Sequence, residues 1–153
     1  RRGIRGAKAM SALGFAPSVM AAYLGGNLVY RMGAQVSRNA WLRRLVDFTP
    51  VMLEAELAHD QPTHREVEGV PVVLVRHRGE ISALANPCGH AGCPLAEGKI
   101  DNGTIVCACH GSTFRLRDGA VLHGPAPVAQ PSFEVRVVDG RIFIRSRPRQ
   151  VGL

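Results

Sequence analysis

The stretches CGHAGC at residues 88–93 and CACHGS at residues 107–112 decide how this chain of 153 residues is interpreted. They contain all four of its cysteines, and each stretch also contains one histidine. Thiolates and imidazoles are side chains with which proteins bind transition metals such as zinc and iron. The clustering therefore predicts a metal centre rather than a disulfide scaffold.

The spacing of these residues favours a binuclear iron–sulfur cluster. Cys88 and His90 form a C-x-H pair, sixteen residues follow, and Cys107 and His110 form a C-x-x-H pair. A [2Fe–2S] cluster with two Cys on one iron and two His on the other needs this set, and the neutral imidazoles raise its reduction potential. The loops also contain glycines whose lack of a side chain should let backbone amides donate hydrogen bonds to the sulfurs: Gly89, Gly92 and Gly111.

Structural zinc is the alternative occupant, because two Cys and two His also make a zinc site. Zinc fingers usually pair Cys with Cys and His with His along the chain. Here each segment pairs one Cys with one His and adds a second Cys. This order favours the iron–sulfur interpretation.

The pattern resembles the Rieske [2Fe–2S] family over about residues 50 to 148. The resemblance implies that Cys88 and Cys107 hold an inner iron. It also implies that His90 and His110 hold an outer, solvent-facing iron, where single electrons enter and leave. One [2Fe–2S] cluster per chain is the expected cofactor.

Further features resemble the Rieske subunits of cytochrome bc complexes. Cys93 and Cys109 lie where that subgroup has a disulfide joining the two cluster loops. The sequence GPAP at 124–127 resembles its proline loop, so Pro125 is expected beside the cluster. Ser112 follows His-Gly, where the family places a hydroxyl that donates a hydrogen bond to a bridging sulfide.

Two positions depart from the cytochrome bc pattern. Phe114 stands where that pattern has a Tyr that donates a hydrogen bond to a ligand sulfur. Fewer hydrogen bonds to sulfur stabilise the reduced state less, so we predict a potential below the cytochrome bc type but above that of dioxygenase ferredoxins. Ala91 replaces a large apolar residue beside the exposed histidine, which argues against quinol docking in the cytochrome bc manner.

Residues 49–148 alternate short β-type runs with polar turns. The runs at 70–75 and 133–138 are rich in Val, and pairs such as Asn102-Gly103 and Asp139-Gly140 are typical hairpin turns. Many short strands predict a small antiparallel all-β domain, a Rieske-type barrel or sandwich with a cluster-binding subdomain. Residues 149–153 would form a tail.

Residues 1–48 are predicted to form a membrane anchor. Residues 1–46 contain eight Lys or Arg and no acidic residue, a charge of +8, whereas the rest of the chain carries −1. No charge occurs over the 22 positions from Ala9 to Tyr30, and an α-helix of that length spans about 33 Å, enough for a hydrocarbon core. The sequence predicts an N-terminal transmembrane helix, with a Gly- and Ala-rich helix packed on a soluble protein, or an export signal, as alternatives.

Residues 31–48 are expected to form an amphipathic connector on the membrane surface. Trp41, Leu42, Leu45 and Val46 supply its apolar side chains. The preceding residues 22–31 resemble the last helix of a bacterial multi-spanning membrane domain sometimes fused to a Rieske domain. Because basic residues surround an apolar stretch and no aromatic residues are interleaved with them, nucleic acid is not an expected partner.

These observations predict a membrane-anchored one-electron carrier, a subunit of a respiratory or other membrane redox complex. Its expected partners are a donor and an acceptor redox protein and other membrane helices or subunits, with a nearby quinone as a further candidate. The expected location is the inner or cell membrane, with the Rieske domain on the cytoplasmic face. The alternatives are a ferredoxin component that feeds a Rieske-type oxygenase, and a redox-sensing or structural module.

Overall fold

The computed structural model describes residues 2–33 and 37–147. Contacts divide the chain into two compact units, and the division falls between residues 34 and 35. The predicted tail at 149–153 lies outside the described residues. The two units are described separately below.

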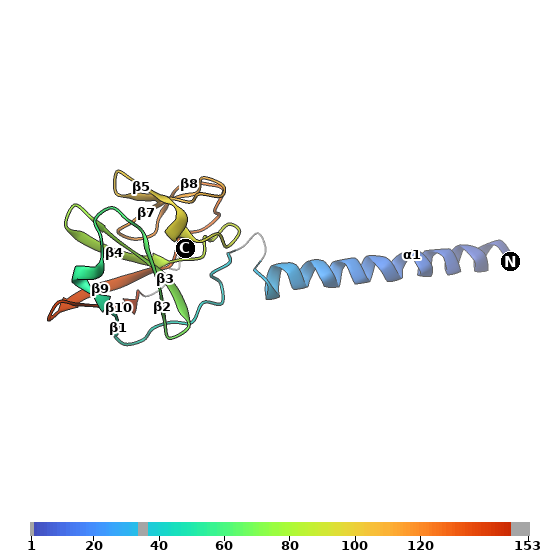
Figure 1. The fold of residues 1–153 in the computed structure, drawn as a ribbon. Coiled ribbons are helices and arrows are strands. Elements are labelled where there is room, and N and C mark those ends of the chain that lie inside the picture. Colours follow the sequence, from blue (N-terminus) through green and yellow to red (C-terminus); the bar gives the residue numbers. More distant parts are fainter. Residues whose placement is uncertain (1, 34–36, 148–153) are drawn as a thin grey trace. The chain divides into compact units, whose positions relative to one another are not determined.

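The first unit is helical. Helix α1 (Arg2–Gly26) continues into a π-helical segment η1 (Asn27–Arg31), so the expected N-terminal helix is present (Figure 1). Within the described residues, however, no helix is both long and apolar enough to cross a membrane. The expected helix is confirmed, and the membrane-spanning character predicted for residues 9–30 is not supported by this finding. Small and polar residues dilute its apolar side chains: Gly14, Pro17, Ser18, Gly25, Gly26 and Asn27.

The second unit is built from two antiparallel sheets, which confirms the all-β prediction. The six-stranded sheet has the order β1-β10-β9-β4-β3-β2, and the four-stranded sheet has the order β5-β6-β7-β8 (Figure 1). The larger sheet contains β1 (Thr49–Leu53), β2 (Thr63–Val67), β3 (Val70–His77), β4 (Glu80–Ala85), β9 (Ser132–Val138) and β10 (Arg141–Ser146). The smaller sheet contains β5 (Lys99–Asp101), β6 (Thr104–Val106), β7 (Thr113–Arg115) and β8 (Val121–His123). Two short 3₁₀ turns, η2 (Glu54–Glu56) and η3 (Leu95–Glu97), complete the unit.

The predicted hairpin turns are present. Both residues of Asn102-Gly103 and of Asp139-Gly140 have positive φ, as a two-residue type I′ turn requires. These turns connect β5 to β6 and β9 to β10. They fix the register in which each pair of strands meets.

Two clusters of apolar side chains form the core. One joins the strands of the larger sheet and includes Leu74, Phe133 and Ile144. The other lies around the smaller sheet and includes Phe114 together with the thiols of Cys88 and Cys107. The second cluster therefore buries the side chains that the sequence assigns to the inner iron.

The connector after residue 36 packs onto the β domain. Leu45 is only 2% exposed and belongs to the core of the larger sheet. Its N–H donates to Oγ of Ser146 at 2.9 Å, and its carbonyl accepts the N–H of Ser146 at 2.9 Å. The prediction that Leu45 lies on a membrane surface is therefore wrong, although Trp41 and Val46 are exposed. The compact unit begins earlier than the predicted boundary at residue 49.

Candidate metal centre

The two predicted ligand segments form loops of the same shape. In loop 1 (residues 88–93) the N–H of Cys88 donates to the carbonyl of Cys93 at 2.8 Å, and the N–H of Gly92 donates to the carbonyl of Cys88 at 2.8 Å. In loop 2 (residues 107–112) the corresponding bonds run from Cys107 to Ser112 at 2.9 Å and from Gly111 to Cys107 at 3.0 Å. Each six-residue loop is therefore closed by the same two backbone hydrogen bonds.

The fifth position of each loop requires a left-handed backbone conformation. Gly92 has φ +84° and Gly111 has φ +75°, values that an L side chain adopts only with strain. This explains why the CGHAGC and CACHGS segments share a Gly at that position. The local sequence thus determines the shape of both loops.

The backbone N–H groups of the three loop glycines all donate to acceptors within the protein. The N–H of Gly89 donates to Oε1 of Gln130, and those of Gly92 and Gly111 donate to carbonyls within their own loops. The expectation that small residues here let backbone amides approach the cluster sulfurs stays a prediction. The three glycines serve loop closure and close packing.

The two predicted thiol ligands lie together in the apolar core. Cys88 and Cys107 are each 2% exposed and form no disulfide. Burial raises the pKa of the Cys88 thiol, and the neighbouring thiol of Cys107 raises it further, against the lowering effects of the His90 backbone amide and the Ser112 hydroxyl. A metal that binds there must displace the thiol proton, since thiolates are the ligands.

The two predicted imidazole ligands form a second pair. The rings of His90 and His110 have centroids 4.8 Å apart and are nearly perpendicular, at 84°. Nδ1 of His90 is buried and has no hydrogen-bond partner, so this nitrogen is free to bind a metal. His110 is exposed, in agreement with the solvent-facing side that the sequence assigned to it.

This arrangement in two pairs fits a two-iron cluster better than zinc. In the described ranges, no three His, Cys, Asp or Glu side chains converge as ligands of a single ion would. A structural zinc site needs four ligands around one ion, whereas each iron of a His₂Cys₂ cluster needs only two protein ligands. Buried thiols on one side and imidazoles on the other match that requirement.

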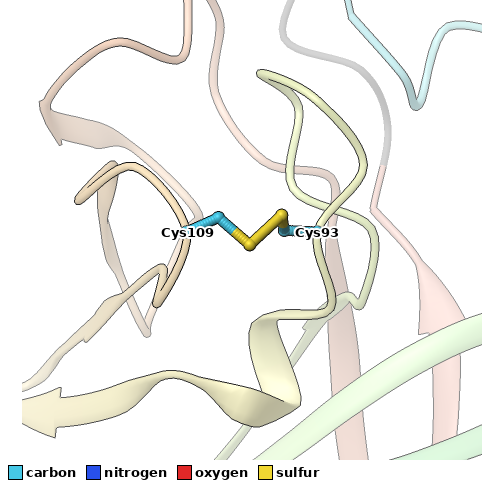
Figure 2. Close-up of a disulfide and its surroundings, with 2 residues drawn as sticks. All are labelled: Cys93 and Cys109. Atoms are coloured by element: carbon cyan, nitrogen blue, oxygen red, sulfur yellow. A yellow bond between two sulfur atoms is a disulfide. The ribbon is translucent and has the colours of Figure 1, made fainter.

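A disulfide joins the two loops (Figure 2). Cys93 at the end of loop 1 is bonded to Cys109 in loop 2, with an S–S distance of 2.03 Å. This confirms the pairing that the family resemblance implied. The bond connects the loops directly, beside the four predicted ligands.

The GPAP segment contacts loop 2 through Ser112. The Ser112 side chain is fully buried, and its Oγ accepts the N–H of Ala126 at 3.0 Å. The hydroxyl hydrogen remains available to the neighbouring Cys88 thiol. Pro125, preceded by a cis peptide bond, is exposed next to this contact.

Residues 47–134 match the Rieske [2Fe-2S] domain family. The chain belongs to this family. The Rieske domain implies a [2Fe–2S] cluster, so the fold and the arrangement of the site agree on the cofactor. The assignment of individual ligands stays a prediction from the sequence.

Rieske relatives of two functional kinds are similar to this chain. The 3-phenylpropionate/cinnamic acid dioxygenase ferredoxin subunit of Photorhabdus laumondii is 37% identical over 82 residues, 52% of this chain and 78% of that protein. The cytochrome b6-f complex iron-sulfur subunit of Chlorobaculum tepidum is 33% identical over 73 residues, 48% of this chain and 39% of that subunit. The chain thus spans well under half of the b6-f subunit.

A solved Rieske ferredoxin has the same fold. The ferredoxin of carbazole 1,9a-dioxygenase from Nocardioides aromaticivorans superposes with a TM-score of 0.60 at 28% identity. The match covers 65% of this Rieske chain and 99% of the ferredoxin. The β domain therefore contains a complete Rieske fold of the ferredoxin size.

Sequence reasoning missed two residues at the site, Gln130 and Asn39. Both are buried amides that hydrogen-bond the backbone around loop 1. Neither lies in a recognisable motif, and an isolated Gln or Asn is usually a surface residue. No signal in the sequence identified them.

Proposed function

We propose that this Rieske electron carrier is the iron–sulfur subunit of a redox complex of the cytochrome bc type. The observation that carries the proposal is the Cys93–Cys109 disulfide between the cluster loops. The contact of the GPAP segment with Ser112 supports it. By the family resemblance, oxygenase ferredoxins usually lack both features.

The chain's own residues suit one-electron transfer at an exposed edge. A bound [2Fe–2S] cluster supplies one-electron oxidation and reduction. We propose that Cys88 and Cys107 bind it on the buried side, where the apolar core excludes water, and that His90 and His110 bind it on the side towards solvent. Because His110 is exposed, a partner's redox centre can approach closest there.

The primary test is low-temperature EPR of the dithionite-reduced chain, with iron, sulfide and zinc measured on the same sample. We expect a rhombic signal of low average g and about two iron atoms per chain, as the His₂Cys₂ ligation requires. An EPR-silent chain that contains one zinc per molecule would overturn the proposal. Measuring all three elements together prevents a partly loaded sample from being misinterpreted.

A second candidate function is the ferredoxin component of an oxygenase system. It is favoured by the similarity to the Photorhabdus ferredoxin subunit and by the fold shared with the carbazole dioxygenase ferredoxin. The midpoint potential distinguishes the two candidates within the Rieske range of roughly −150 to +300 mV. A value near the lower end favours the ferredoxin, and a clearly positive value favours the cytochrome bc type.

The location of the chain also stays a prediction. The sequence predicts the membrane, with the Rieske domain on the cytoplasmic side. Exposed apolar side chains on the helical unit, among them Phe15 and Tyr23, support association with an apolar environment. Fractionation of cells that produce the chain, followed by protease treatment of the intact membranes, tests this prediction.

A further inference from the structure

A buried glutamine holds the start of loop 1 from outside the loop. Gln130 is 2% exposed, and all its amide hydrogen-bonding groups are used. Its Oε1 accepts the N–H of Gly89 at 3.1 Å, and its Nε2 donates to the carbonyls of Ala85 at 2.7 Å and Pro87 at 2.6 Å. Gln130 thus fixes three backbone groups on either side of Cys88.

A buried asparagine holds the same backbone from the connector. Asn39 is also 2% exposed, and its Nδ2 donates to the carbonyl of Pro87 at 2.8 Å. The preceding residue adds a backbone bond, because the N–H of Arg38 donates to the carbonyl of Gly89 at 3.2 Å. Two side-chain amides from opposite ends of the domain sequence therefore share one acceptor, the carbonyl of Pro87.

The remaining atom of Asn39 indicates why the residue is there. Its Oδ1 is buried and has no hydrogen-bond partner among the described residues, and an unsatisfied buried acceptor costs folding stability. The fold tolerates this cost at a position where only the Nδ2 donor is used. The useful function of Asn39 is therefore the bond to Pro87.

We propose that Asn39 and Gln130, here called the amide clamp, are positioning residues for the cluster. The amide clamp fixes the backbone from Ala85 to Gly89, and this backbone orients the Cys88 thiol and the His90 imidazole towards their partners in loop 2. Residues 37–39 then belong to the cluster site instead of to a linker. This inference rests on the proposed ligand set.

Removing the clamp should change the properties of the cluster more than it changes the stability of the fold. Gly89 lies between two proposed ligands, so a freed Gly89 N–H can turn towards cluster sulfur or water, and either change alters the reduction potential. Asn39→Leu removes the donor and the unpaired acceptor together, so its cost in folding stability is small. Gln130→Leu removes three hydrogen bonds, one to Gly89 and one each to Ala85 and Pro87.

The test uses the full chain loaded with its cluster. Ser146→Ala is the matched control. It removes the hydrogen bond that the Leu45 N–H, in the same connector, donates to Oγ of Ser146, and it leaves loop 1 unchanged. The measurements are the EPR g values, the midpoint potential and the rate of cluster loss to a chelator. We expect Asn39→Leu to lose the cluster about fivefold faster, the factor that one lost hydrogen bond of roughly 1 kcal/mol implies. Gln130→Leu removes three bonds and should lose the cluster faster still.

The outcomes separate this inference from the proposed function. Altered g values and potential in Asn39→Leu and Gln130→Leu, with no change in Ser146→Ala, would support the clamp. Spectra, potential and loss rates equal to those of Ser146→Ala would overturn it, while the unmodified chain still contains its cluster. Should Gln130→Leu not fold, Asn39→Leu alone decides. An unmodified chain without iron and sulfide would instead refute the ligand set.

Discussion

Loop 1 and loop 2 have the same internal structure and different supports. Both are closed by the same two backbone hydrogen bonds and both contain a glycine of positive φ at the fifth position. Loop 2 lies between the paired strands β6 and β7. Loop 1 is instead held by side chains from distant parts of the chain, Asn39 and Gln130. A local motif therefore determines the shape of each loop, whereas tertiary contacts determine where the loop points.

The loops also differ in exposure. His110 in loop 2 is exposed, whereas His90 in loop 1 is half-buried and its Nδ1 is shielded from solvent. Under the proposed function, a redox partner would meet loop 2 more directly. Loop 1 provides the more fixed half of the site, and loop 2 the more exposed half.

The largest expected effect tests whether the two loops contribute equally to binding of the cluster. Cys88→Ser and Cys107→Ser each remove one thiol ligand of the proposed inner iron. We expect both variants to lose the cluster, with iron falling from about two atoms per chain to none, because a hydroxyl is a poor substitute for a thiolate. Iron analysis and EPR measure this loss.

His123→Ala is the control for these variants, since it removes an exposed imidazole outside the proposed ligand set. It should retain the full iron content. A Cys88→Ser or Cys107→Ser chain with an unchanged rhombic spectrum would contradict the ligand assignment for that loop.

The next effect concerns the bond that joins the loops. Replacing both Cys93 and Cys109 by Ser removes a disulfide that closes a segment with a sequence separation of 16. A loop of that size contributes about 3 kcal/mol to stability by constraining the unfolded chain. Urea unfolding should show a loss of this order, and dithiothreitol treatment of the unmodified chain should reproduce it. Equal stability of the double-Ser variant and the unmodified chain would mean that the amide clamp and the GPAP segment suffice to hold the loops together.

Short-range features could be predicted from the sequence because they depend on neighbouring residues. The strands and the hairpin turns agree with the sequence. The pairing of Cys93 with Cys109 agrees instead with what the family resemblance implied. The amide clamp could not be predicted, because each of its hydrogen bonds joins two residues that lie between 41 and 48 positions apart in the sequence. The burial of Leu45 was missed for the same reason, since its partner Ser146 is 101 positions away.

The N-terminal helix shows a different limit of sequence reasoning. The absence of charge from Ala9 to Tyr30 is visible in the sequence and predicted a spanning helix. An uncharged stretch is not necessarily an apolar one, because glycine, serine and asparagine add length without hydrophobicity. The helix is therefore confirmed, whereas its predicted membrane-spanning character is not supported.

Substitutions at the shared glycines test the equivalence of the loops directly. A Cβ at Gly111 would have nothing within 4 Å, and at Gly92 it would make ordinary contact with Cγ of Arg38 at 3.7 Å. Gly92→Ala and Gly111→Ala should therefore lower the free energy of unfolding by nearly the same amount, about 1 to 2 kcal/mol, because both introduce the same backbone strain. Urea unfolding measures both.

Asn tolerates positive φ better than Ala. Gly92→Asn and Gly111→Asn should therefore recover part of the loss, which identifies backbone strain as the cause. A clearly larger cost in one loop would show that the common hydrogen-bond pattern hides a difference in packing.

A smaller effect concerns the residue that follows loop 2 on β7. Phe114 is fully buried beside the two thiols, and it lacks the hydroxyl of the cytochrome bc pattern. If Phe114→Tyr donates one hydrogen bond to sulfur, worth about 1 kcal/mol, the midpoint potential rises by about 40 mV, since a one-electron couple changes by 59 mV per tenfold. A redox titration that shows no rise would remove Phe114 as an explanation for a low potential.

The smallest effect lies in the turn beyond β7, where Asp118 binds Arg115. Its Oδ2 accepts from Nη1 of Arg115 at 2.9 Å and its Oδ1 accepts the N–H of Ala120 at 3.0 Å. Burial acts to raise the pKa of Asp118, but the Ala120 amide and the Arg115 guanidinium outweigh it and hold the pKa below its ordinary value. The carboxylate therefore contributes stability above the unfolded pKa, about 3.9, and this contribution is lost as the pH falls through the lower folded value.

Asp118→Asn should accordingly destabilise the chain at pH 7 by under about 1 kcal/mol, because a third of this side chain is exposed and solvent screens the ion pair. Unfolding measured at pH 7 and again well below pH 4 should show the difference shrinking at the acidic pH. Asp101→Asn, an exposed carboxylate in the same sheet, is the control. A difference that persists unchanged at acidic pH would show that the effect of Asp118→Asn does not arise from the charge of the carboxylate.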